Sequence, residues 1–186
     1  MSRRFLLVGS ALVVALATAG VLTQFGFGGS DKVQIGNGSV SALARAERTG
    51  DALPENVLSY PFAERNFASP DGRGSRVLSV HGSLTLYAVP GKAGMLCLIE
   101  ADSLAGTAGG ACADRSILKT GSIYMADREE DGSLQVVGLV GDGHTFAEAN
   151  GRRTSVENNS FLLSRVEGNE LSIGSPTATQ EIDLGG

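Results

Sequence analysis

The residues of this chain best suited to chemistry are a histidine and an aspartate two positions apart. His144 and Asp142 occur in the glycine-rich stretch GLVGDGHTF, and residues two apart on an extended segment share a face. Asp142 could therefore orient His144 as the general base of a small hydrolase, which would also need a nucleophilic serine. No Gly-x-Ser-x-Gly elbow marks such a serine. Because Asp-Gly readily forms bends, we interpret the stretch as a surface turn and keep the hydrolase as an alternative.

A second candidate is the acidic stretch DREEDGS. It puts Asp127, Glu129 and Asp131 at the first, third and fifth positions of a calcium loop, with Gly132 at the sixth. The twelfth position is Gly138 instead of the bidentate glutamate, and strands are expected on both sides. We therefore interpret the stretch as a charged hairpin, with weak calcium binding as the alternative. No other metal or cofactor is predicted.

Two further patterns have simpler interpretations. Ser116 and Lys119 in SILK have the spacing of serine acyl-enzymes, but the KTG that follows shares the same lysine. Penicillin-recognising folds use two separate lysines, so we interpret the overlap as coincidence. His81 lies next to Gly82 in an alternating segment, as expected of an ordinary strand histidine. The sequence thus predicts no catalytic residue and a protein that is not an enzyme.

The N-terminal region carries the strongest signal in the sequence. From Phe5 to Ser30 the chain has no charged residue, and this apolar run follows SRR. A run of this length can cross the roughly 30 Å of membrane hydrocarbon as a helix, and the preceding arginines favour a cytoplasmic N-terminus. Residues 1–30 are therefore predicted to be a signal anchor that contacts the cytoplasmic membrane through residues 5–27. A cleavable signal peptide is the alternative, because Ala17 and Ala19 end small-x-small motifs.

Charge and cysteine content agree with a location outside the membrane. The formal net charge of -5 repels phosphate backbones, and the strongest basic cluster is only the pair Arg152-Arg153, so no nucleic-acid partner is expected. The two cysteines, Cys97 and Cys112, flank the flexible stretch SLAGTAGGA. In an oxidising compartment they are well placed to form a disulfide.

The pattern of turns and apolar segments predicts a mainly β protein. We expect a linker with a short helix over 31–75, a β-domain over 76–174 and a disordered tail over 175–186. The helix is expected in SVSALARAER with a serine cap at Ser39. Short strands separated by NG, DG and NNS bends favour a small antiparallel sandwich or barrel. The expected strands are RVLSVHGSLTLYAVP, MLCLIEA, SIYMAD, LQVVGLV, HTFAEA, RTSVEN, FLLSRVE and ELSIG.

Residues 95–161 resemble a type of small extracytoplasmic domain that recurs in high-GC Gram-positive bacteria. In that type a Gly-x-Cys-Leu-like strand and a second cysteine precede a GLVPDGV bend, and a V-x-x-N strand follows. Here Gly141 replaces the usual proline and His144 the usual valine. The type has no assigned activity, so the resemblance implies a fold and a location only. The matching residues are Cys97, Cys112, Gly138, Leu139, Val140, Asp142, Gly143, Val156 and Asn159.

The sequence therefore predicts a β-domain that is anchored to the cell membrane with its C-terminal part outside, or is secreted. We expect it to be a non-catalytic binding or structural module whose partner is an unknown protein or cell-surface ligand. A hydrolase that uses His144 and Asp142 and a regulator within a membrane complex remain the alternatives.

Overall fold

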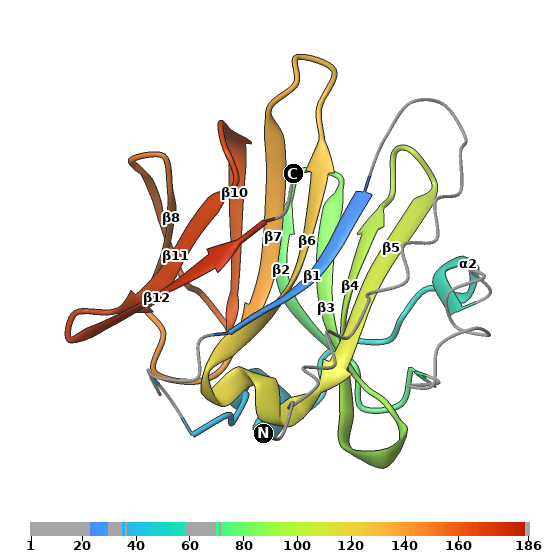
Figure 1. Cartoon of the computed structure of the whole chain (residues 1–186). Coiled ribbons are helices and arrows are strands. Elements are labelled where there is room, and N and C mark those ends of the chain that lie inside the picture. Colours follow the sequence, from blue (N-terminus) through green and yellow to red (C-terminus); the bar gives the residue numbers. More distant parts are fainter. Residues whose placement is uncertain (1–22, 30–34, 36, 59–69, 71, 185–186) are drawn as a thin grey trace, which may run out of the picture.

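The computed structural model describes residues 23–29, 35, 37–58, 70 and 72–184 (Figure 1). These residues form three antiparallel sheets with four strands each. Sheet A has the order β1-β6-β7-β10, sheet B the order β2-β3-β4-β5, and sheet C the order β12-β11-β8-β9. The elements are β1 (Thr23–Gly29), α1 (Ser41–Ala44), α2 (Glu55–Leu58), β2 (Arg76–His81), β3 (Leu84–Pro90), η1 (Lys92–Gly94), β4 (Met95–Asp102), β5 (Thr107–Asp114), η2 (Arg115–Lys119), β6 (Gly121–Arg128), β7 (Leu134–Val140), β8 (Phe146–Ala149), β9 (Arg152–Ser155), β10 (Ser160–Val166), β11 (Glu170–Ser175) and β12 (Ala178–Asp183).

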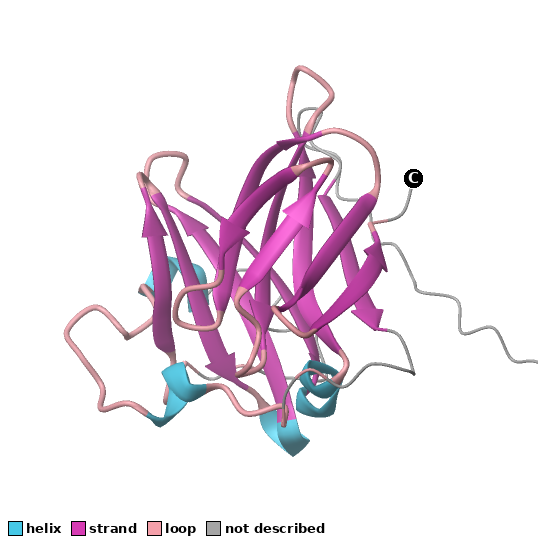
Figure 2. Ribbon diagram, turned by 90° about the vertical axis from the view of Figure 1, so that its left-hand side faces the viewer, coloured by secondary structure: helices cyan, strands magenta, loops and turns pink. Residues whose placement is uncertain are grey.

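Sheet A is the middle of three layers and buries both of its faces. On β6, Ile123 and Met125 point into a core shared with sheet B, the A–B core. Tyr124 and Ala126 point the opposite way, into a core shared with sheet C, the A–C core. This alternation follows from the pleat of a strand, and burial of both faces explains why β6 and β7 are almost continuously apolar. Figures 1 and 2 show the helices at the periphery of these layers.

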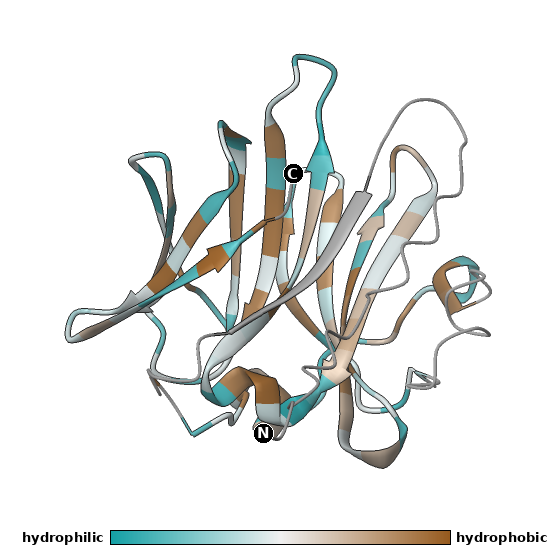
Figure 3. Cartoon of the chain, viewed as in Figure 1, coloured by the Kyte–Doolittle hydropathy of each residue, from teal (hydrophilic) through white to brown (hydrophobic). Residues whose placement is uncertain are grey.

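The prediction of a mainly β, antiparallel fold is confirmed. Brown, hydrophobic segments follow the central strands, while the end of the β6–β7 hairpin is hydrophilic (Figure 3). Two of the predicted bends have the backbone that tight hairpins need: Asn150 and Gly151 have φ of 48° and 74°, and Asn158 and Asn159 have φ of 47° and 66°. Positive φ at both central residues matches the right-handed twist of the flanking strands, and asparagine and glycine reach it at low cost.

Two phenylalanines cover glycines on neighbouring strands. Phe161 of β10 lies directly opposite Gly138 of β7, and Phe146 of β8 lies opposite Gly174 of β11. A Cβ added at Gly138 would overlap the Phe161 ring, and one added at Gly174 would lie 3.0 Å from the Phe146 ring. At these positions the absence of a side chain allows an aromatic ring to pack on the backbone of the next strand.

Replacing Gly138 with alanine should lower the free energy of unfolding by about 1–3 kcal/mol, because the new methyl group displaces a ring in a closely packed core. Urea denaturation of the full chain measures this loss. Gly109→Ala is the matched control, because a Cβ at Gly109 of β5 meets Met125 Sδ at an ordinary 3.7 Å. Equal stability of the two variants would contradict the proposed packing of Phe161.

Two segments expected to be irregular are strands. The predicted disordered tail contains β12, which pairs with β11 from Glu170↔Asp183 to Ser175↔Ala178. The prediction of a disordered tail is therefore wrong for residues 178–183, because Gln180 and Ile182 alternate with exposed residues and bury one face of the strand. The stretch expected to be a flexible loop between the cysteines contains β5, which pairs with β4 along its whole length.

The N-terminal prediction is corrected in part. Residues 1–22 lie outside the described residues, but Thr23–Gly29 form β1 and pair with β6 from Thr23↔Asp127 to Gly29↔Gly121. Phe25 and Phe27 alternate with glycines, a period of two that suits a strand. Residues 23–27 therefore belong to sheet A instead of the predicted membrane segment. Among the residues that the structure describes, no helix has the length and apolar character needed to span a membrane.

Candidate functional site

Asp142 lies in the segment that crosses from sheet A to sheet C, between β7 and β8. Its main-chain N–H donates to the Ser39 carbonyl oxygen at 2.7 Å. Its Oδ1 accepts hydrogen bonds from the Ser41 N–H at 2.9 Å and from Asn159 Nδ2 at 2.8 Å. Partial burial acts to raise the pKa of Asp142, but the bonds from Asn159 and Ser41 outweigh it and hold this pKa below its ordinary value.

Asn159 completes the same arrangement from the turn before β10. Its Oδ1 accepts from the Ala42 N–H at 3.0 Å and from Ser41 Oγ at 3.1 Å. Asp142 and Asn159, which we call the clamp, therefore hold the main chain of residues 39–42. The two residues come from separate parts of the resemblance noted above, the bend and the V-x-x-N element, and the structure brings them into direct contact.

The clamp replaces the helix cap expected from the sequence. Helix α1 has Val40 at its N-cap position, without a side-chain cap, so the prediction of a cap by Ser39 is wrong. The amides of Ser41 and Ala42 are instead satisfied by side chains more than a hundred residues away. Val40 and Ala42 are buried in the A–B core, which fixes the segment on its apolar side as well.

Replacing Asp142 with alanine should open the segment 39–45 locally and lower the free energy of unfolding by about 1–3 kcal/mol, because the Ser41 amide loses its acceptor. Hydrogen exchange at the amides of Ser41 and Ala42 measures the opening. Asp131→Ala is the control, since this exposed carboxylate accepts hydrogen bonds from Ser133 within its own turn. Unchanged exchange at both amides in Asp142→Ala would show that the apolar contacts alone hold the segment.

A second fastening lies a few residues further along the chain. Two nitrogens of Arg45 contact the two carboxylate oxygens of Asp51, each at 2.6 Å. Asp51 also accepts from the amides of Arg48 at 2.6 Å and Val77 at 2.9 Å. The bonds from Arg45, together with those two amides, hold the pKa of Asp51 well below its ordinary value despite burial. We call residues 39–51 the strap, because the clamp and this ion pair fasten them to the β-layers.

The predicted turn is present at Asp142-Gly143, where Gly143 is exposed, but the His144 side chain that follows is buried, with 6% of its surface exposed. Its Nδ1 lies 2.9 Å from the Gly141 carbonyl oxygen, while its Nε2 is buried without a hydrogen-bond partner. Burial lowers the pKa of His144 and the bond to Gly141 only partly offsets this, which favours the neutral imidazole. The structure shows no hydrogen bond between His144 and Asp142, and no serine hydroxyl among the described residues bonds to Nε2.

The remaining sequence candidates lie on three different parts of the chain. Asp127 lies on β6, and Glu129 and Asp131 lie in the β6–β7 hairpin, where Asp131 Oδ1 accepts from the amide and the hydroxyl of Ser133 at 3.0 and 2.6 Å. Within the described part of the chain no three acidic, histidine or cysteine side chains are placed to hold a metal. Ser116 and Lys119 are both exposed on η2, and His81 is exposed at the end of β2.

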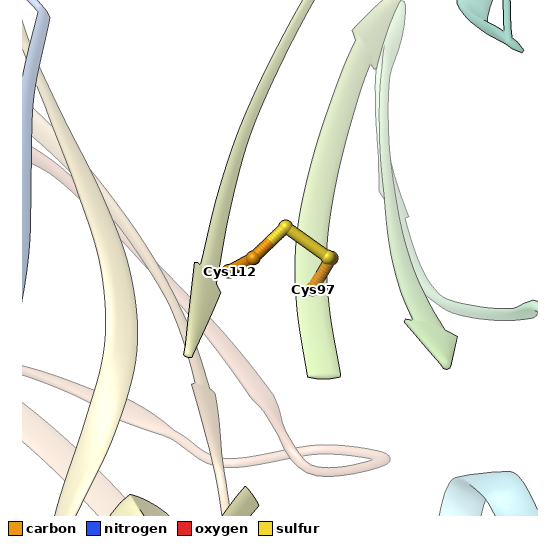
Figure 4. The surroundings of a disulfide bond; sticks show 2 residues. All are labelled: Cys97 and Cys112. Carbon is orange, nitrogen blue, oxygen red and sulfur yellow. A yellow bond between two sulfur atoms is a disulfide. The ribbon is translucent and has the colours of Figure 1, made fainter. Parts of the chain in front are cut away.

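The predicted disulfide between Cys97 and Cys112 is confirmed (Figure 4). The cysteines lie directly opposite each other on β4 and β5 and are almost completely buried. They belong to an apolar cluster on the outer face of sheet B, which Leu53 and Val57 cover. The disulfide therefore joins two neighbouring strands of one sheet beneath the region that follows the strap.

Glu100 of β4 is a titratable group that the sequence did not single out. Its Oε2 is buried without a hydrogen-bond partner. Burial raises the pKa of Glu100 to about 7, helped by the negative charges of Asp127, Asp102 and Glu129. The alternation of side chains along β4 is enough to predict that Glu100 shares a face with Leu98. The closeness of Glu100 to Asp127 of β6 could not be predicted in this way, because it depends on how sheets A and B pack against each other.

Replacing Glu100 with glutamine should stabilise the protein by about 2 kcal/mol near pH 8 and have little effect near pH 4. The folded pKa of about 7 lies above the ordinary 4.5, so the stability linked to Glu100 is complete below pH 4.5 and is lost as the pH rises through 7. Thermal and urea denaturation across this range measure the difference. Glu181→Gln is the control, because Glu181 is exposed on β12 and is not among the charges that act on Glu100. A Glu100→Gln variant with the parent's pH profile would contradict the raised pKa.

Among the described residues, the candidate side chains bind other parts of the fold and are not assembled into one reacting set. Asp142 and Asn159 bind main chain, Asp51 binds Arg45, and His144 is enclosed. Two residues of the resemblance, Asp142 and Asn159, thus form the clamp that holds the strap. Comparisons with protein-family models, with curated proteins and with solved structures found no match to the chain.

Proposed function

We propose that the chain is an exported, membrane-anchored or secreted β-domain that acts outside the cytoplasmic membrane as a non-catalytic binding or structural module. The observation that carries the proposal is the buried disulfide between Cys97 and Cys112. Disulfides persist in oxidising compartments and are rare in the cytosol of most cells. The uncharged run that precedes β1, with arginines before it, supports the same location.

The non-catalytic part of the proposal rests on how the polar side chains are used. A general base must lie within hydrogen-bond reach of the group that it deprotonates. His144 is buried, and the structure places neither Asp142 nor a serine against its Nε2. Asp142 instead accepts two hydrogen bonds in the clamp. These side chains stabilise the fold, which is what a module with a binding or structural role requires.

Protease treatment of intact cells that produce the full chain tests the location. We expect the β-domain to be digested, or recovered from the medium, while a cytoplasmic marker stays intact. Thiol labelling after denaturation should find both cysteines blocked until a reductant is added. The control carries Val14→Lys together with Leu16→Lys, which interrupts the apolar run and should leave the chain inside with both thiols free.

The mass of the recovered chain separates the two modes of attachment. A full-length product in the membrane fraction indicates a retained anchor, whereas a product shortened near Ala17 or Ala19 indicates a cleaved signal peptide. Protection of the parent protein from protease inside intact cells, with free thiols, would overturn the proposal. The role as a non-catalytic module is tested by His144→Phe, which should leave binding and cellular phenotype unchanged if the protein folds normally.

A further inference from the structure

Three buried polar side chains near one end of the A–C core each have at least one polar atom without a hydrogen-bond partner. Ser122, His144 and Gln180 are 0%, 6% and 1% exposed. The atoms without a hydrogen-bond partner are Ser122 Oγ, His144 Nε2, and both Oε1 and Nε2 of Gln180. A buried polar group without a partner costs about 1–3 kcal/mol, so native proteins rarely leave several such groups unsatisfied.

Strand register places Ser122 and Gln180 towards the same end of the layers, and His144 lies in the segment that crosses between the sheets at that end. Ser122 pairs with Val140, the last residue of β7, and shares its face with Tyr124, which points into the A–C core. His144 follows a few residues later in the crossing to sheet C. The next residue, Thr145, donates its N–H to the Gly174 carbonyl oxygen at 2.7 Å.

Gln180 completes the set from the facing sheet. Gly174 pairs with Thr179, the neighbour of Gln180 on β12. Gln180 shares its inward face with Ile182, which belongs to the A–C core. Sheets A and C meet directly in this region, since Tyr124 Oη donates to the Asp183 carbonyl oxygen at 3.1 Å.

We propose that Ser122, His144 and Gln180 form an internal site that binds ordered water between sheets A and C. The site needs a small neutral ligand that both donates and accepts hydrogen bonds. The Gly141 carbonyl can only accept, so His144 Nδ1 carries the proton and Nε2 must accept. Gln180 has two donors and an acceptor to satisfy, and the Ser122 hydroxyl can serve in either role. Water meets these demands, and buried water typically makes about three such bonds.

Nuclear Overhauser effects between water and protein protons test the site. They are measured by NMR on the isotope-labelled full chain in detergent micelles. We expect cross-peaks of long-lived water to the side-chain amide protons of Gln180, and a nitrogen shift of His144 Nε2 that shows an accepted hydrogen bond. Gln180→Leu should shift the His144 Nε2 signal towards the value of an unbonded imidazole, whereas Gln135→Leu on β7 should leave it unchanged. Ser122→Ala provides a second variant if Gln180→Leu does not fold.

Two results would overturn the proposal. The first is the absence of water cross-peaks at Gln180 together with an unbonded Nε2 signal. The second is an added mass in native mass spectrometry that disappears, with the hydrogen-bonded Nε2 signal, after unfolding and refolding in plain buffer, because a retained solute would then fill the site. Water returns on refolding, so preserved cross-peaks after that treatment support the proposal.

Discussion

An Arg45→Met variant is expected to lose about 3 kcal/mol of its free energy of unfolding, because a buried carboxylate is left without its cation. The Asp51 side chain is 2% exposed, and Arg45 supplies two of its hydrogen bonds. The methionine keeps most of the apolar stem of arginine, so the loss reports the charge and the hydrogen bonds. Urea denaturation near neutral pH measures it.

The pH dependence of the same variant gives an independent check. The folded pKa of Asp51 lies below its unfolded value, so the stability from this group is present above the unfolded pKa of about 4 and is lost as the pH falls. The parent should therefore lose more stability on acidification than Arg45→Met does. Arg153→Met is the matched control, since the side chains of the Arg153–Glu148 pair are 60% and 33% exposed. Arg153 also lies 4.0 Å from the centre of the Phe146 ring, and the two contacts together should contribute less than about 2 kcal/mol. Similar losses in both variants would contradict a special role for the Arg45–Asp51 pair.

Replacing both Cys97 and Cys112 with alanine is expected to lower the free energy of unfolding by about 3 kcal/mol, the value for a loop of this length. The disulfide links β4 to β5 across a sequence separation of 15 residues. Without it, the unfolded chain gains freedom while the folded strands keep their pairing. Thermal unfolding of the oxidised parent and the variant measures the difference.

Reductant supplies the internal control for the disulfide. Full reduction of the parent should bring its stability close to that of the double variant, and the double variant should not respond to reductant. If the double variant lost no stability, the hairpin of β4 and β5 would have to persist in the unfolded chain and restrict it as the disulfide does. The single variant Cys97→Ala is less informative, because it leaves one reactive thiol that can form dimers.

The sequence predicted the features that depend on local patterns. The Asn150-Gly151 and Asn158-Asn159 turns follow from the ease with which asparagine and glycine take positive φ. The disulfide followed from two cysteines at a loop-closing spacing in a chain whose uncharged N-terminal run predicts export. The stretch around β5 gave no such signal, because Gly109 and Gly110 have no side chains to alternate, and its burial comes from packing on Met125 of another sheet.

The clamp shows why the candidate site was harder to predict. Asp142 and Asn159 were noticed as parts of a motif, but their partners, the amides of Ser41 and Ala42, are main-chain groups that every sequence contains. The contact depends on how the strap passes over sheets A and B. His144 was placed at the surface because Asp-Gly bends usually lie there. The bend itself has an exposed Gly143, but the side chain of His144 is buried where the chain crosses from sheet A to sheet C.

Burial of both faces of sheet A sets an order on maturation. Strands β6 and β7 emerge from the ribosome or the export channel well before β8, β11 and β12 have followed. Until then, no layer covers Val136 and Val140. This face of sheet A is therefore an exposed apolar surface that favours aggregation. We expect the A–C core to close only when the last strands of sheet C have been made, which leaves this face of sheet A open to aggregation until then.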